Sequence, residues 1–211
     1  MELPSSDKIL HNQAYPHVEL AASDAVKHYI RLDPTKSQAP TRDNADTPSN
    51  QSVPSALPDA KQTQVHPAGS SGKENASLYF VGTATTILEW EGVRIMTDPN
   101  FLHAGDHVHL GPGVTGTRQT NPAVDLHELP RIDAVLLSHY HADHFDQLVE
   151  DSLRRDLPII TTPHARKHLF GGKEEHERFT EVYDLDFFES TPNSQAYFMS
   201  FSRWRSKLIN V

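Results

Sequence analysis

The chain has 211 residues, including 14 histidines and no cysteine, and its formal net charge is −9 at pH 7. The lack of cysteine excludes a disulfide scaffold, a cysteine nucleophile and a thiolate metal site. The acidic balance argues against a nucleic-acid partner. No apolar run approaches the roughly 20 residues of a transmembrane segment, and the start lacks the features of a signal peptide. We therefore expect a cytoplasmic protein.

Residues 1–76 are predicted to form a disordered N-terminal tail. Over residues 33–76 the sequence is rich in Pro, Ser, Asn, Asp and Gln and has no aromatic residue. Such a composition cannot bury enough apolar area to offset the entropy of ordering the backbone. Ahead of this stretch, residues 24–32 are compatible with a short helix. It would be either a transient helix in the tail or a helix docked on the following domain.

Residues 77–189 have the pattern of an α/β domain. Three strands are predicted first, with a tight turn at residues 91–92 that makes a hairpin of the last two: Ser77–Val81, Ala84–Trp90 and Val93–Thr97. Residues 100–131 are expected to be a long loop, with a flexible glycine-rich stretch at residues 111–116. The segment 190–211 has no clear pattern and is left unassigned.

Strands and helices alternate after this loop. Buried strands are predicted at Ala134–Leu137 and Pro158–Thr161, and a further strand at Arg178–Tyr183. Between them, four apolar residues fall on one helical face: Phe145, Leu148, Val149 and Leu153. Thr162 and Pro163 are typical of a helix start, and Gly171 of a helix end.

The segment Ser138–Asp146, between a buried strand and a helix, concentrates groups that bind metals. It contains His139, His141, Asp143 and His144. Neutral imidazole and carboxylate suit zinc, and also manganese or iron. The spacing lets the first two histidines converge on one ion, while the other two residues hold a second. Two ions about 3.5–4 Å apart can share a hydroxide that is nucleophilic at neutral pH. The alternative is a chance cluster in a histidine-rich chain.

The segment His139–His144 matches the H-x-H-x-D-H signature of the metallo-β-lactamase superfamily. Two longer stretches, VGTATTILEWEGVRIMTDPNF and LPRIDAVLLSHYHADHFD, resemble one branch of it. That branch contains L-ascorbate-6-phosphate lactonases and N-acylphosphatidylethanolamine-hydrolysing phospholipase D. The resemblance covers about residues 78–170. It implies an αββα sandwich fold with a site that holds one or two Zn²⁺, or Mn²⁺ or Fe²⁺.

Carried over to this sequence, the resemblance assigns His139 and His141 to a first metal. It assigns Asp143 and His144 to a second metal, and it gives Asp143 a catalytic part in positioning water or moving its proton. Asp98 would brace the metal loop by hydrogen bonds. No substrate-binding residue can be assigned.

The family takes its remaining ligands from the second half of its fold. Here the histidines that follow the signature are His164, His168 and His176, and we find no bridging aspartate among the residues after it. The sequence therefore predicts only the N-terminal half of the sandwich, with weak metal binding. The sheet face that would meet the other half should be apolar and exposed, which favours self-association.

The expected function is that of a metal-dependent hydrolase in which metal-bound hydroxide attacks an ester, lactone or phosphodiester. Its substrate would be a small or lipid-like molecule, a class compatible with peripheral membrane contact. One alternative is a non-catalytic, truncated remnant that binds metal weakly or not at all. The other is a nuclease, which the net charge of −9 disfavours.

Overall fold

A computed structural model describes residues 30, 32, 38–42, 53–63, 69, 72–171, 173–186, 190–192 and 198–200. Most of the expected tail, and all but two residues of the possible helix 24–32, lie outside this set. The division into tail, domain and C-terminal segment therefore stays a prediction.

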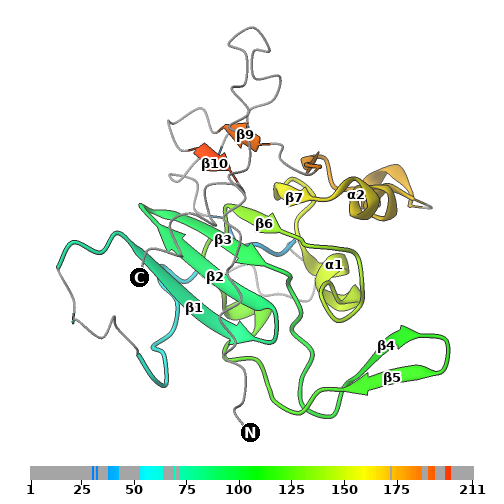
Figure 1. Ribbon diagram of the computed structural model, residues 1–211, viewed down its shortest axis with the longest axis horizontal. Helices are drawn as coiled ribbons and strands as arrows, with labels where there is room; N and C mark the ends of the chain where they lie inside the picture. Colours follow the sequence, from blue (N-terminus) through cyan, green and yellow to red (C-terminus); the bar gives the residue numbers. More distant parts are fainter. Residues whose placement is uncertain are drawn as a thin grey trace, which may run out of the picture.

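The described residues form a six-stranded mixed sheet with helices beside it, which confirms the predicted α/β fold (Figure 1). The strands, in spatial order, are β1 (Ala76–Gly82), β2 (Thr85–Trp90), β3 (Val93–Thr97), β6 (Ala134–Leu136), β7 (Ile159–Thr161) and β8 (Val182–Asp184). The β1–β2 and β2–β3 pairs are antiparallel, whereas β3, β6, β7 and β8 run parallel. The parallel strands bring their carboxyl ends to one edge of the sheet.

The predicted hairpin between β2 and β3 is present and closes through Glu91 and Gly92. Both residues have positive φ, 49° and 80°. Two successive residues with positive φ give a two-residue turn whose twist matches that of the strands. Glycine adopts this backbone conformation readily, which is why the turn could be found in the sequence.

Two short α-helices follow the parallel strands. They are α1 (Gln147–Ser152) and α2 (Pro163–Phe170), and single 3₁₀ turns occur at η1 (Leu126–Glu128) and η2 (Glu175–Glu177). The predicted cap of α2 is present, because the Thr162 hydroxyl accepts a hydrogen bond from the Ala165 amide. One of the four residues expected on the apolar face of the helix between β6 and β7 is not buried. Leu148 is 70% exposed, whereas Phe145, Val149 and Leu153 are buried as expected.

Both faces of the sheet are apolar. One face packs against the two helices in the main core, whose members include Ile87, Met96, Val135, Ile159, Val149, Leu153, Ala165 and Leu169. On the opposite face, Ala134 and Ile160 are buried together with Ile30 and Leu32 from the N-terminal part of the chain. A sheet with two apolar faces is built to be a central layer of a domain.

Further described pieces of the N-terminal part also contact the domain. The Arg42 amide donates to the Ser152 carbonyl, and the Arg154 amide donates to the Pro40 carbonyl. Thr41 forms an isolated antiparallel bridge with Leu153. Nothing in the composition of residues 33–76 indicated these contacts.

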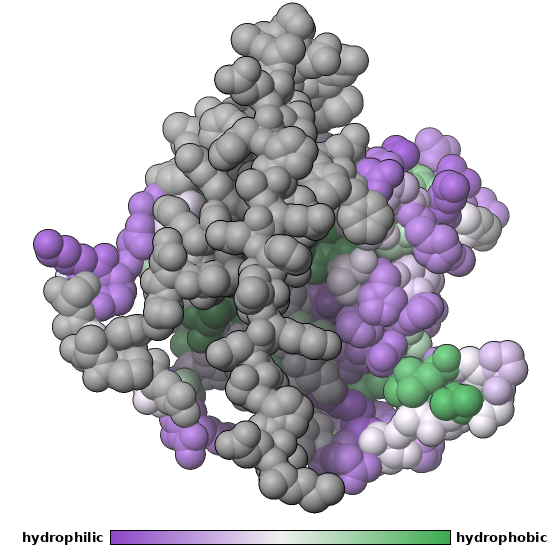
Figure 2. Space-filling model, viewed as in Figure 1, coloured by the Kyte–Doolittle hydropathy of each residue, from purple (hydrophilic) through white to green (hydrophobic). Residues whose placement is uncertain are grey.

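The region expected to be a long loop contains a hairpin, so this expectation was wrong. Strands β4 (His107–Gly111) and β5 (Val114–Thr117) pair antiparallel and project from the side of the molecule (Figure 1). The turn uses Gly113 with φ 75°, so the glycines that suggested flexibility instead allow a tight turn. Leu110 and Val114 are 48% and 54% exposed, and an apolar patch covers this region in Figure 2. In the unassigned C-terminal segment, β9 (Ser190–Pro192) pairs antiparallel with β10 (Phe198–Ser200).

Candidate metal site

The loop between β6 and α1 forms a tight turn at the carboxyl end of a parallel strand, where α/β proteins commonly bind ligands. The amides of His144 and Phe145 both donate to the His141 carbonyl, at 2.9 and 2.7 Å. The Phe145 side chain is buried in the main core. Asp146 then ends the loop by capping α1, because its carboxylate accepts from the Val149 amide at 2.8 Å. Core packing and the cap together fix the loop backbone.

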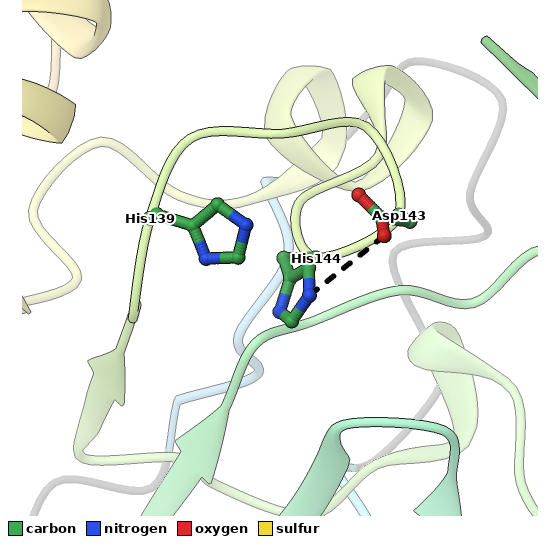
Figure 3. A group of neighbouring side chains, drawn as sticks. All are labelled: His139, Asp143 and His144. Carbon is green, nitrogen blue, oxygen red and sulfur yellow. Dashed lines mark ion pairs between the residues drawn. The ribbon is translucent and has the colours of Figure 1, made fainter. Parts of the chain in front are cut away.

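Three of the predicted ligands face one another (Figure 3). One donor atom from each of His139, Asp143 and His144 lies within 4.8 Å of the others. His144 Nε2 is 3.8 Å from an Asp143 oxygen, and the rings of His139 and His144 have centroids 4.0 Å apart. Two imidazoles and one carboxylate are a donor set that fits zinc, and the same set accepts manganese or iron.

The fourth predicted ligand, His141, lies beside this group rather than in it. Its ring packs edge-on against that of His139, with centroids 4.6 Å apart, and its side chain is exposed. The sequence paired His139 with His141 and Asp143 with His144. The structure instead groups one residue of the first pair with both residues of the second.

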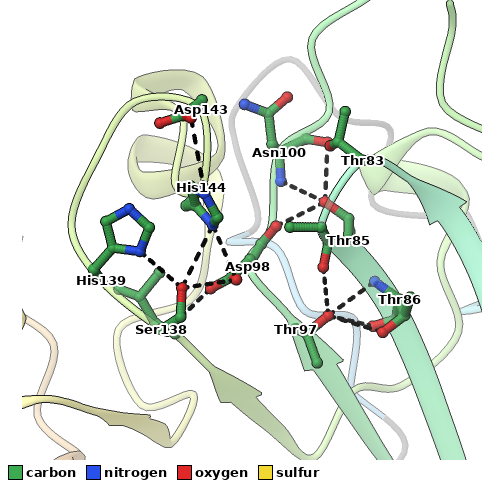
Figure 4. Close-up of polar contacts among 12 residues, drawn as sticks. Thr83, Thr85, Thr86, Thr97, Asp98, Asn100, Ser138, His139, Asp143 and His144 are labelled. Atoms are coloured by element: carbon green, nitrogen blue, oxygen red, sulfur yellow. Dashed lines mark hydrogen bonds and ion pairs between the residues drawn. The ribbon is translucent and has the colours of Figure 1, made fainter. Parts of the chain in front are cut away.

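Asp98 forms hydrogen bonds to the metal loop from the end of β3 (Figure 4). Its carboxylate accepts from the Ser138 amide at 2.7 Å and from the Ser138 hydroxyl at 2.8 Å. It also lies 3.0 Å from His144 Nδ1. A proton on Nδ1, held by this carboxylate, leaves the Nε2 lone pair free on the side of Asp143. In this tautomer, Nε2 is the nitrogen of His144 that could bind a metal.

The backbone of Asp98 is itself held in an unusual conformation, with φ 34°. The buried Thr85 hydroxyl donates to the Asp98 carbonyl at 2.7 Å and accepts from the Asn100 amide at 3.0 Å. The Asn100 side-chain amide then donates to the Ala142 carbonyl in the metal loop, at 3.0 Å. Thr85 and Asn100 are functional candidates that the sequence reasoning missed. Their only signal was their place inside the stretch VGTATTILEWEGVRIMTDPNF.

The electrostatics of the loop favour the neutral form of His139. Burial lowers the pKa of His139, and the neighbouring His144 and His141 lower it further, while Asp98 and Asp143 act in the opposite direction. A lower pKa keeps the imidazole unprotonated to more acidic pH. Because only neutral imidazole binds a metal, this shift makes His139 available as a ligand at neutral pH.

A cavity of about 290 Å³ opens beside the metal loop. Asp143 and His144 line one side of it, and Thr83 and Asn100 lie on the side of the sheet. Val108 and Arg118, from the β4–β5 hairpin region, also line the cavity. The cavity gives a small molecule access to two of the three clustered metal-binding side chains.

Part of the chain matches a known protein family. Residues 94–192 match the family model of the β-lactamase superfamily domain. This match covers just under half of the chain and supports membership in the metallo-β-lactamase superfamily. The resemblance seen in the sequence is thereby confirmed for the superfamily.

Two relatives of this chain have names that state a reaction. It is 33% identical over 89 residues to the mitochondrial N-acyl-phosphatidylethanolamine-hydrolyzing phospholipase D of Saccharomyces cerevisiae, covering 42% of this chain and 18% of the relative. It is 32% identical over 77 residues to N-acyl-phosphatidylethanolamine-hydrolyzing phospholipase D 1 of Caenorhabditis elegans, covering 36% of this chain and 20% of the relative. The matched region thus spans about a fifth of each relative.

Two solved structures are also similar. An isothiocyanate hydrolase from Delia radicum gut bacteria has a TM-score of 0.41 and 23% identity, covering 52% of this chain and 41% of the other. A possible metal-dependent hydrolase from Veillonella parvula has a TM-score of 0.45 and 20% identity, covering 56% of this chain and 44% of the other.

None of the helices in the described part of the chain has the length and apolar character of a transmembrane span.

Proposed function

We propose that this chain provides the metal-binding part of a hydrolase that cleaves a phosphodiester or ester bond in a lipid-like substrate. The observation that carries the proposal is the group of His139, Asp143 and His144 beside an open cavity. The relatives' names support hydrolysis as the reaction class. His141 is a candidate for a further ligand, because its ring lies next to that of His139.

Each residue of the loop has a proposed part in the chemistry. His139, Asp143 and His144 would hold a divalent ion, which when bound acidifies water and polarises the bond to be cleaved. Asp98 keeps His144 oriented through Nδ1. Asp143 lines the cavity, so its second oxygen is placed to orient a water molecule or accept its proton.

The lipid-like substrate class has two supports. Two relatives are named for the hydrolysis of an N-acylated phospholipid. In this chain, Val108 brings an apolar side chain to a cavity that also has polar walls. Leu110 and Val114, further out on the same hairpin, expose apolar surface where an acyl chain or a membrane surface could make contact.

A further proposal concerns self-association. We propose that copies of the chain associate through the apolar face of β1, where Leu78 and Phe80 are each 65% exposed. The expected cytoplasmic location and the expected lack of a nucleic-acid partner stay predictions.

The function is tested with the purified full chain loaded with Zn²⁺, Mn²⁺ or Fe²⁺. Hydrolysis is measured on N-acylphosphatidylethanolamine, a synthetic phosphodiester, a lactone and an RNA oligonucleotide. We expect cleavage of the phosphodiesters that carry acyl chains, and we expect His144→Ala to reduce it at least about 100-fold. His164→Ala, on α2, is the control and should leave the rate near that of the wild type. RNA cleavage, or equal rates for His144→Ala and the wild type, would contradict the proposal.

A further inference from the structure

Arg118, the residue that follows β5, lines the cavity and forms no ion pair with another described residue. Two of its guanidinium nitrogens, Nε and Nη2, are buried and have no hydrogen-bond partner among the described residues. A guanidinium carries five N–H donors and stays charged at all physiological pH values. Leaving such donors buried and unpaired is costly, and among the described arginines with such nitrogens Arg118 has two of them and lines the cavity.

The surrounding backbone is arranged to hold this side chain in place. The Arg118 amide donates to the Asp106 carbonyl, and the Gly105 amide donates to the Arg118 carbonyl, both at 2.9 Å. Gly82, at the end of β1, lies close to the guanidinium group. A Cβ atom at position 82 would come within 3.3 Å of Arg118 Nη2. Glycine therefore leaves the space that the guanidinium occupies.

The nearby carboxylates do not neutralise Arg118. Asp146 is near enough for Arg118 to lower its pKa, against the larger effect of burial, which raises it. The Asp146 oxygens are already bonded to the amides of Phe101 and Val149, each at 2.8 Å. Asp143 lines the same cavity and has an oxygen 3.8 Å from His144 Nε2. No ion pair to Arg118 occurs among the described residues.

We propose that Arg118 binds the anionic phosphodiester group of the substrate and positions it beside the metal-binding side chains. Arg118 and the pair Asp143–His144 belong to the same cavity wall, so one bound group can reach both. The planar guanidinium donates two parallel hydrogen bonds to phosphate oxygens, which a point charge cannot do. In a chain with net charge −9, a local cation is also needed to admit an anion.

Anion binding can be tested without metal and without turnover. Metal-free full chain is titrated with dimethyl phosphate, inorganic phosphate and acetate by calorimetry, and the Nε–H resonance of Arg118 is followed by NMR in the wild type. We expect that resonance to shift on addition of dimethyl phosphate. Arg118→Gln should weaken dimethyl phosphate binding roughly 10- to 100-fold, the range for a lost charge-assisted hydrogen-bonding pair. The affinity of Arg118→Lys for dimethyl phosphate should lie between those of the wild type and Arg118→Gln, because lysine keeps the positive charge but lacks the planar guanidinium group.

Arg166→Gln is the control, because Arg166 lies on α2 with a half-exposed side chain and pairs with Asp184. It should bind dimethyl phosphate like the wild type. An unchanged Arg118 resonance, or equal affinities for the wild type and a folded Arg118 variant, would overturn the proposal. Equal binding of acetate and dimethyl phosphate would overturn the assignment to phosphodiesters, and tighter binding of inorganic phosphate would point to free phosphate as the ligand.

The assignment of a phosphodiester as the cleaved bond rests on the proposed function. Kinetic measurements distinguish a failure of that function from a failure of the Arg118 assignment. In the zinc-loaded chain, Arg118→Gln should raise KM for a phosphodiester at least about tenfold and leave KM for an uncharged lactone unchanged. Its zinc content should equal that of the wild type, because Arg118 is outside the metal-binding group. If no substrate is cleaved but anion binding still depends on Arg118, the proposed function fails and the Arg118 assignment stands.

Discussion

At the scale of single residues, Asp98 connects the end of β3 to the metal loop. Its carboxylate contacts the Ser138 amide, the Ser138 hydroxyl and His144 Nδ1 at once. Substitution by asparagine preserves the shape of the side chain. It replaces one acceptor oxygen with an NH₂ group, which cannot accept the proton on His144 Nδ1.

We predict that Asp98→Asn weakens zinc binding roughly 10- to 100-fold while the chain still folds, the usual range for loss of a group that orients a metal ligand. Zinc affinity is measured by competition with a chromophoric chelator, and folding by circular dichroism. Asp156→Asn is a matched control, because that carboxylate pairs with Arg154 away from the loop. Equal losses for the two variants would show that Asp98 has no special role.

Some residues of the candidate site could be recognised in the sequence and others could not. The signature His139–His144 was recognisable because its residue types and spacing are unusual, and Asp98 was assigned through the resemblance to the family. Thr85, Asn100 and Arg118 were missed, because a threonine, an asparagine or an arginine in a strand or loop is ordinary in any chain. Only the buried hydrogen bonds and the cavity distinguish them.

At the scale of elements, Asp146 connects α1 to the segment after β3. Its two carboxylate oxygens accept from the Val149 amide in α1 and from the Phe101 amide, each at 2.8 Å. Removing it leaves a helix cap unfilled and a buried amide without a partner.

We therefore predict that Asp146→Ala destabilises the chain by roughly 2–4 kcal/mol, the sum of a lost cap and an unsatisfied buried donor. Thr162→Ala removes only the cap of α2 and should cost about 0.5–2 kcal/mol. Urea unfolding followed by fluorescence measures both. A smaller loss for Asp146→Ala than for Thr162→Ala would refute the proposed connection.

Most of the sheet strands could be predicted from local patterns, since β2 and β3 alternate around a glycine turn and β6 and β7 are short apolar runs. The last strand was predicted too early, at Arg178–Tyr183, whereas β8 is Val182–Asp184. The β4–β5 hairpin could not, because the glycines around Pro112 are compatible with a flexible loop as well as with a turn. The burial of Ile30 and Leu32 was also unpredictable. It depends on the distant residues Ala134 and Ile160, whereas composition describes only neighbours in the sequence.

At the scale of the whole molecule, the second face of the sheet is unevenly covered. Ile30 and Leu32 lie over the strands β6 and β7. Leu78 and Phe80, on the same face of β1, are each 65% exposed. Exposed apolar side chains on a β-strand are a common site of association.

We predict that the chain self-associates at micromolar concentration and that the double substitution Leu78→Ser and Phe80→Ser shifts it toward monomer. Sedimentation velocity over a concentration series measures this. Leu148→Ser, which removes an equally exposed leucine from α1, is the control and should leave association unchanged. A wild type that stays monomeric at every concentration would contradict the prediction.

The central claim is that His139, Asp143 and His144 hold a metal ion, and X-ray absorption at the zinc edge of the zinc-loaded full chain tests it most directly. The wild-type spectrum should show nitrogen and oxygen ligands at about 2.0–2.2 Å with imidazole scattering. His144→Ala should lose part of the imidazole contribution and bind zinc more weakly, while His164→Ala should give the wild-type spectrum. A His144→Ala spectrum and zinc content identical to those of the wild type would contradict the account.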